Sequence, residues 1–262
     1  MIEALEYGFM RNALAAGLLV SLACGIVGAY VVVNRIVFIS GGIAHAAYGG
    51  IGLGYYLGVN PILGAMFFSL AAAVGMGIVQ RRTRQRADTL IGVLWAVGMA
   101  VGIIMVDRTP GYKPDLMSYL FGSILAVPTA DLWVMAALDL VIVAVVVALY
   151  KELLAISFDE TFAIVSGVAV EALRILLVCL IGLTAVMMMR VVGLIMVIAL
   201  LTIPAAISGM YVRDLWRMMV MGTVLGMAFT FTGLWLSYAL NLTSGATIIL
   251  VAGTAYLVAL AA

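Results

Sequence analysis

The only histidine of the chain, His45, lies in the stretch GGIAHAAYGGIGLG, residues 41–54, among glycines and alanines. An imidazole can bind a metal ion or carry a proton, so a lone one inside an apolar stretch is a candidate for either task. A carboxylic acid, Asp139, also lies inside a long apolar run. Ionisable groups in such runs are costly and usually mark a transport path or a pair. Two interpretations are therefore open: the two residues line a path, or they satisfy each other or a backbone carbonyl.

The other metal-binding residue types do not define a metal site by their spacing. Zinc takes three or four N, O or S ligands, often spaced as in HxxxH or CxxC, and neither motif occurs. Cys24 and Cys179 stand alone in apolar runs, and the 17 methionines are scattered as in ordinary apolar packing. A metal site would need ligands that converge from several helices or from two copies of the chain.

Composition indicates which elements must position these groups. Of the 262 residues, 66% are hydrophobic and 10% are charged, whereas soluble domains are about half apolar and a quarter charged. This predicts an all-α polytopic membrane protein, and the net charge of +1 gives no sign of nucleic-acid binding. The acidic start MIEALEYGFM is unlike a cleaved signal peptide, so we expect the first apolar run to be a span.

A transmembrane helix needs about 20 apolar residues, which predicts eight or nine spans in a single transmembrane domain, residues 1–262. The segment LMSYLFGSILAV, 116–127, is too short to cross and should lie in the interface or re-enter the membrane. The nine candidates are 8–33, 36–58, 61–80, 89–106, 131–150, 171–189, 191–210, 217–240 and 245–261.

The basic residues orient the spans. Short cytoplasmic loops carry an excess of lysine and arginine, and RRTRQR, residues 81–86, carries four arginines. Alternation from this loop predicts an N-terminus outside the cell and a cytoplasmic C-terminus. It places on the cytoplasmic side Arg35, Lys151, Arg213 and Arg217, and on the other side Arg11, Arg108, Lys113 and Arg190.

Small residues recur at every fourth position of the second candidate span. Such a stripe lets helix backbones approach closely in lipid, so we expect this helix to be buried in the bundle. The face of His45 also carries glycines, at 41, 49 and 52, and a neighbouring helix or a cavity must occupy the space they leave. His45 is about 15 Å from Arg35 along a helix, near the middle of a ~30 Å hydrocarbon core. The stripe consists of Gly42, Ala46, Gly50, Gly54 and Gly58.

The chain carries no GxxxxGK[ST] phosphate-binding loop and no cluster of nucleophile, base and acid. We therefore expect no catalytic residues, and energy for transport must come from a partner that docks on the cytoplasmic side. The best docking candidate is YKELLAISFDETFAIVSGV, residues 150–168, which interrupts the apolar pattern with charges.

Within this segment, SFDETFA is typical of the start of a helix, capped by Ser157 or Asp159. Phe158 and Phe162 are four residues apart and would share one helical face. Because Asp159 and Glu160 make the segment acidic, we expect it to bind a protein rather than anionic lipid.

Six segments, in this order, resemble the membrane subunits of bacterial and archaeal ABC importers for zinc, manganese and related metals. The resemblance covers essentially the whole chain. The segments are ISGGIAHA (39–46), the arginine-rich loop followed by DTLIGVLWAVGMAVG, DLMSYLFGSILAV (115–127), YKELLAISFDETFA (150–163), VVGLIMVIALLTIPAA (191–206) and SYALNLTSGATIILV (237–251).

This resemblance implies a multi-pass, homodimeric permease in the cell membrane of a prokaryote, similar in architecture to the vitamin B12 and siderophore importers. Two ATP-binding subunits would dock at about 151–167, and an extracytoplasmic metal-binding protein would deliver the cargo. ATP and magnesium would bind to the partner ATPase, so we expect no cofactor on this chain. Its remaining partner is membrane lipid.

Two positions depart from the family pattern. The family usually has an aspartate four residues before the histidine and another before the last span, where this chain has Gly41 and Asn241. Both changes remove a negative charge that would attract a divalent cation. The cargo is then either a divalent metal held weakly along a path through His45, Asp139 and Asn241, or a metal chelate. A proton-driven secondary transporter using His45 and Asp139 is a further alternative, and it would need broken helices in matching halves.

Overall fold

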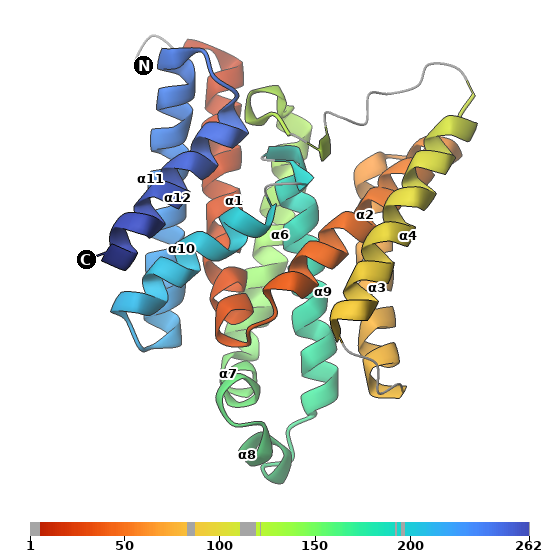
Figure 1. Ribbon diagram of the computed structural model, residues 1–262, viewed down its shortest axis with the longest axis vertical. Coiled ribbons are helices and arrows are strands. Elements are labelled where there is room, and N and C mark those ends of the chain that lie inside the picture. The colour runs from red at the N-terminus through yellow and green to blue at the C-terminus, as the bar shows by residue number, and fades with distance from the viewer. Residues whose placement is uncertain are drawn as a thin grey trace. The chain divides into compact units, whose positions relative to one another are not determined.

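Every regular element in the described part of the chain is a helix (Figure 1). The computed structural model describes residues 6–82, 87–110, 119–120, 122–191, 193–194 and 197–261. Its helices are α1 (Gly8–Val33), α2 (Val37–Leu57), α3 (Pro61–Arg82), α4 (Ala87–Arg108), η2 (Ile124–Ala126), α6 (Thr129–Ala148), α7 (Tyr150–Phe158), α8 (Glu160–Val165), α9 (Val170–Val191), α10 (Val197–Tyr211), α11 (Leu215–Leu240) and α12 (Ser244–Ala261).

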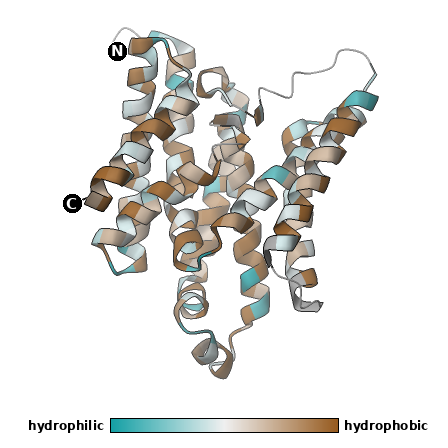
Figure 2. Cartoon of the chain, viewed as in Figure 1, coloured by the Kyte–Doolittle hydropathy of each residue, from teal (hydrophilic) through white to brown (hydrophobic). Residues whose placement is uncertain are grey.

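The long helices are apolar enough to cross a membrane, as the sequence predicts. Eight helices in the described residues are long and apolar enough to do so, and α2 is the most completely buried of them. Figure 2 shows hydrophobic residues along the length of these helices. Long, predominantly apolar helices are expected of membrane spans. The prediction of a polytopic all-α membrane protein is confirmed.

The candidate span 191–210 is described only in part, because residues 192, 195 and 196 lie outside the described residues. The described helix α10, Val197–Tyr211, has 15 residues, or about 22 Å at 1.5 Å per residue, compared with the ~30 Å of a hydrocarbon core. Residues 83–86 of the basic loop, and 116–118 and 121 of the short apolar segment, lie outside the described residues. The predicted behaviour of both segments stays a prediction.

The helices form two compact units, each of which draws on distant parts of the chain. The first unit contains residues 1–35, 117–150 and 187–262. In it, α1 contacts α6, α10 and α11, and α12 packs on α10 and α11. Ile207, Phe229 and Ala252, one from each of α10, α11 and α12, form a buried apolar cluster there.

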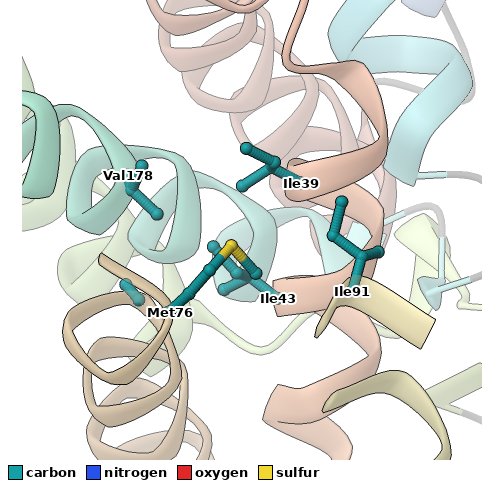
Figure 3. Close-up of a cluster of buried hydrophobic side chains, with 6 residues drawn as sticks. Ile39, Ile43, Met76, Ile91 and Val178 are labelled. Carbon is teal, nitrogen blue, oxygen red and sulfur yellow. The ribbon is translucent and has the colours of Figure 1, made fainter. Parts of the chain in front are cut away.

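The second unit contains residues 36–116 and 151–186, and α2 packs against both α3 and α4. One end of α2 contributes to a buried apolar cluster (Figure 3). Figure 3 shows side chains from four helices meeting there, since α2, α3, α4 and α9 each contribute at least one. The cluster consists of Ile39, Ile43, Ala73, Met76, Ile91 and Val178.

Beyond this cluster, the contact of α2 with α3 is between backbones. A Cβ on Gly50 would collide with the carbonyl oxygen of Gly64, and one on Gly54 would lie 2.8 Å from the Cα of Pro61. The other end of the predicted stripe faces α4, where a Cβ on Gly42 would lie 2.7 Å from the Cγ2 of Ile91. A fourth-residue stripe drifts by about 40° per step around a helix of 3.6 residues per turn, so it passes from one neighbour to the other.

Gly58 differs from the predicted stripe. It follows the last residue of α2 at φ +67°, and no described atom lies within 4 Å of the position of a Cβ. A left-handed residue at this position ends a helix, and glycine adopts that conformation without strain. Gly58 therefore terminates α2 rather than packing it.

Two glycine-to-alanine variants test the backbone contact. Gly50→Ala places a methyl group against the backbone of α3 and should lower the unfolding temperature of the purified protein or prevent its expression. Gly75→Ala, in α3, meets no described atom within 4 Å. It should be neutral or stabilise the protein by about 0.5–1 kcal/mol through helix propensity. Thermal unfolding in one detergent measures both, and equal behaviour of the two variants would contradict the contact.

Candidate functional site

His45 lies near the middle of the buried helix α2, which starts at Val37 and ends at Leu57. Its side chain is buried, with 5% exposed. Its Nδ1 atom lies 2.8 Å from the carbonyl oxygen of Gly41, one turn earlier in the helix. A carbonyl oxygen only accepts hydrogen bonds, so in this geometry Nδ1 carries the proton and donates it. The lone pair of the neutral ring is then on Nε2, which is the arrangement in which imidazole binds a metal.

The ring of Trp95, from α4, covers His45. The two ring centroids are 3.6 Å apart and the planes are inclined by 25°, so the rings are stacked. The sequence left two alternatives for the space beside the imidazole, and a neighbouring side chain occupies it. Trp95 is 37% exposed, so it forms the outer layer over the buried imidazole.

Glycines bring α4 close enough for this stacking. A Cβ on Gly98 would lie 2.5 Å from the Cα of Ala46, and a Cβ on Gly49 would lie 2.8 Å from the carbonyl oxygen of Gly98. One turn further on, a Cβ on Gly52 would collide with the backbone of Gly102. The glycines on the histidine side of α2 therefore serve contact with α4.

The environment of His45 provides one candidate ligand atom and no complete metal cage. The described residues contain no group of three or more His, Cys, Asp or Glu side chains that could hold a metal ion. At position 41, where a carboxylate could reach the same helical face, glycine offers only its carbonyl oxygen, and that oxygen is bonded to His45. Any further ligand must come from a different element or a different molecule.

Asp139 lies in the middle of α6 and is 4% exposed. Neither of its carboxylate oxygens has a hydrogen-bond partner among the described residues. It belongs to the first compact unit and His45 to the second, so the pairing of the two stays a prediction. A buried carboxyl group without a partner costs free energy, and it must be protonated or neutralised by a cation.

Asn241 lies at the exposed C-terminal end of α11, with a left-handed backbone at φ +52°. Asparagine is the residue after glycine that most readily adopts this conformation at the end of a helix. The geometry gives Asn241 a role in ending α11. This exposed position at the end of a helix does not by itself place the Asn241 side chain on a path through the membrane.

The predicted docking segment forms two helices instead of one. α7 ends at Phe158, and α8 begins at Glu160 after the capping residue Asp159. The carboxylate of Asp159 accepts a hydrogen bond from the backbone N–H of Phe162 at 2.8 Å. Of the two predicted caps, Asp159 is the correct one, since the hydroxyl of Ser157 donates to the carbonyl oxygen of Leu153 at 2.7 Å.

Phe158 and Phe162 do not share one helix, because the chain turns at Asp159 between them. Both are nevertheless exposed, at 62% each. Ile164 and Val165 of α8 are also exposed, at 60% and 83%. We refer to these four residues as the α7–α8 apolar surface. The sequence interpretation missed Ile164 and Val165, although the run FAIV would have indicated them.

Two of the acidic residues of this segment, Asp159 and Glu160, have partners within the chain. Asp159 caps α8, and Glu160 accepts a hydrogen bond from the guanidinium of Arg174 at 2.7 Å. Both side chains of this ion pair are about half exposed, so it adds little stability. Substitution of either acid would change the local helix as well as any partner contact, so the apolar residues are the cleaner probes of docking.

Trp95 is the other functional residue that sequence reasoning missed. It lies in the run LIGVLWAVGMAVG, between Gly92 and Gly98. A large aromatic residue among small ones on a membrane helix was the available signal. Its pairing with His45 depends on which helix lies beside α2, and the sequence around Trp95 does not reveal which helix that is.

Comparison with known proteins places the chain among transport proteins. Residues 6–262 match the ABC 3 transport family. The membrane protein slr2045 of Synechocystis sp. is 60% identical over 261 residues, which cover 100% of this chain and 93% of that protein. The manganese transport system membrane protein MntC of Listeria monocytogenes is 33% identical over 255 residues, which cover 97% of this chain and 91% of that protein.

A solved structure extends this likeness to the fold. PsaBC from Streptococcus pneumoniae, in complex with Fab, matches with a TM-score of 0.89 at 30% sequence identity. The match covers 98% of this chain and 93% of the compared chain. The chain therefore shares the fold of that solved structure over nearly its whole length.

Replacement of the unpartnered carboxyl group tests its environment. Asp139→Leu removes a buried polar group that has no partner to lose, and should raise the free energy of unfolding by about 1–3 kcal/mol. The control is Asp131→Leu on the same helix. Asp131 is also buried, but it lies in the first turn and has an interaction partner. This control should lower the unfolding temperature, and a similar loss in Asp139→Leu would mean that Asp139 has a partner too.

Proposed function

The chain belongs to the ABC 3 transport family, and we propose that it is the permease of an ABC importer whose cargo is a divalent metal ion, manganese or zinc. The observation that carries this proposal is the full-length likeness to a manganese transport system membrane protein, MntC. The composition agrees, because eight apolar helices leave no room for a nucleotide-binding domain in the described residues. Transport must then draw on ATP bound to a separate subunit.

In this proposal His45 contacts the ion during its passage. Its Nδ1 is held by the carbonyl oxygen of Gly41, which leaves Nε2 as the ligand atom. Imidazole nitrogen suits zinc, whereas manganese prefers oxygen ligands, and a single protein ligand holds either ion only weakly. A weak contact suits a path, because an ion that binds tightly leaves slowly. Asp139 and Asn241 remain proposed members of the same path.

The path opens by alternating access. The His45 side chain is buried, with Trp95 stacked on one face of its ring, so groups around it must move for an ion to reach Nε2. ATP-driven closure of two partner ATPases would supply that motion. We propose that they dock on the α7–α8 apolar surface, because four exposed apolar residues on two helices too short to span a membrane need a protein cover.

The proposed assembly rests on the resemblance to metal ABC importers, and its orientation rests on the distribution of basic residues. We propose a homodimer in a prokaryotic cell membrane, supplied by a metal-binding protein on the outer side. The N-terminus would face outwards and the C-terminus the cytoplasm, since Arg35, Lys151, Arg213 and Arg217 then lie on the cytoplasmic side.

The alternatives from the sequence lose support. A chelate would need space beside the glycines of α2, and Gly49 and Gly52 instead face the backbone of α4. A proton-driven transporter finds no support in a family of ABC transport proteins.

Cellular metal content tests the cargo. Cells that express the complete transporter with wild-type permease should accumulate manganese or zinc. His45→Ala should reduce that accumulation by about ten-fold, the lower range for the loss of a metal-site group. The matched control is Ser40→Ala, another buried polar residue of α2 bonded to its own backbone. Equal accumulation in all three would show that His45 is a packing residue, and no accumulation with wild type would overturn the metal cargo.

Binding of the ATPase tests the docking surface. Phe162→Ala should weaken the affinity of the permease for its ATPase by about 2 kcal/mol, or roughly 30-fold, if this ring is an anchor of the interface. Phe67→Ala, in the span α3, removes a similarly exposed ring, at 71%, from a helix long enough to cross the membrane, and should leave binding unchanged. Equal affinities of wild type and both variants would place docking elsewhere.

A further inference from the structure

An apolar groove of about 280 Å³ lies in the first compact unit between α1, α6 and α11. Figure 1 shows these three helices side by side. Of the eleven residues that line the groove, ten are aliphatic, methionine or tryptophan, and the other is Thr223. Val147, Val220 and Val224 are 61%, 49% and 59% exposed, so the groove opens to the outside of the unit.

The groove has the length of one membrane leaflet. On α11 its lining extends from Trp216, at the start of the helix, to Met227. The eleven steps from residue 216 to residue 227 cover about 16 Å of helix, roughly half of a ~30 Å hydrocarbon core. On α6 the lining is confined to the last six residues of the helix, 143–148. The groove therefore starts at one membrane surface and ends near the midplane.

Two basic residues lie close in sequence to Trp216, the lining residue at the start of α11. Arg213 precedes the helix, Arg217 follows Trp216 in its first turn, and both are exposed. The carboxylate of Asp214 accepts a hydrogen bond from the backbone N–H of Arg217 at 2.9 Å, so it is engaged in capping the helix. Two arginines at a helix N-terminus attract a phosphate group.

Two aromatic residues mark the level of the membrane surface at this end of the groove. Tyr150 packs edge-on against Trp216, with ring centroids 6.3 Å apart. Burial, and after it the carboxylate of Asp214, raises the pKa of Tyr150, while a hydrogen bond with the Trp216 backbone opposes the shift. Tryptophan and tyrosine are enriched at this depth, where the headgroups lie.

From this combination we propose that the groove binds one anionic phospholipid of the leaflet that faces Arg213 and Arg217. An acyl chain lies along Val220 and Val224, and the phosphate lies against the two arginines. The apolar lining matches an acyl chain in length, and the two arginines match the charge of a phosphate group at the level of the headgroups. By the orientation proposed above, this is the cytoplasmic leaflet, but the proposal does not depend on which ion the permease carries.

Lipid binding to the full-length permease in detergent, counted by native mass spectrometry, tests the site. Wild type should bind phosphatidylglycerol more tightly than phosphatidylcholine, by about five-fold for each arginine, which corresponds to about 1 kcal/mol per basic residue. Arg213→Gln with Arg217→Gln should abolish this preference and leave binding of phosphatidylcholine unchanged. Both arginines are exposed, so the double variant should fold.

Filling the groove tests the acyl-chain position. Val224→Trp should reduce the binding of both lipids, whereas Leu250→Trp, at an exposed position of α12 outside the groove, should not. The proposal would be overturned if wild type showed no preference for phosphatidylglycerol, or if Val224→Trp bound both lipids like wild type. It would also be overturned if Val224→Trp kept its lipid binding but changed the number of permease copies per particle. The last result would assign the groove to a second copy of the chain.

Discussion

Close contact between helix backbones is the constraint on which the second unit depends. In a bilayer, apolar side chains gain nothing by leaving lipid for each other, so helices associate through packing at small residues. In α2, the glycines at 50 and 54 meet α3, while Gly42, Ala46 and Gly49 meet α4. A helix with close neighbours on two sides has no room for side chains at those positions. This explains why the most buried span of the protein is also rich in glycine.

The chemistry of His45 follows from the same contacts. Because α4 comes close at Gly98, the ring of Trp95, one turn earlier, stacks on the imidazole. Because residue 41 is a glycine, the only acceptor one turn before His45 is a backbone carbonyl, and it holds Nδ1. A carboxylate at that position would add a negative ligand, whereas a carbonyl orients the ring and leaves the ligand set incomplete. The packing thus decides which nitrogen is offered and what shields it.

Sequence patterns predicted what depends on nearby residues and failed where distant residues decide. Span length, the stripe of small residues and the cap at Asp159 are local properties, and the structure has a helix or a cap at each. The predicted shared face of Phe158 and Phe162 was wrong because a helix capped by Asp159 begins after Phe158, which ends the preceding helix α7. The role of Gly58 was missed since spacing alone does not reveal a positive φ. The partner of His45 depends on which helix lies beside α2, and a single sequence does not encode that in its periodicity.

An exposed aromatic residue has a different significance on a membrane-spanning helix than on the short helices α7 and α8. Phe67 and Phe158 are exposed to a similar degree, at 71% and 62%. Phe67 lies in a helix long enough to cross the membrane, where acyl chains cover it without any partner. Phe158 ends a nine-residue helix, too short to cross the membrane, and is followed by Asp159 and Glu160. Exposed apolar area beside carboxylates, on elements too short to span, is costly in water and in lipid alike. A protein surface satisfies both, which is why the α7–α8 apolar surface fits an energy-supplying partner.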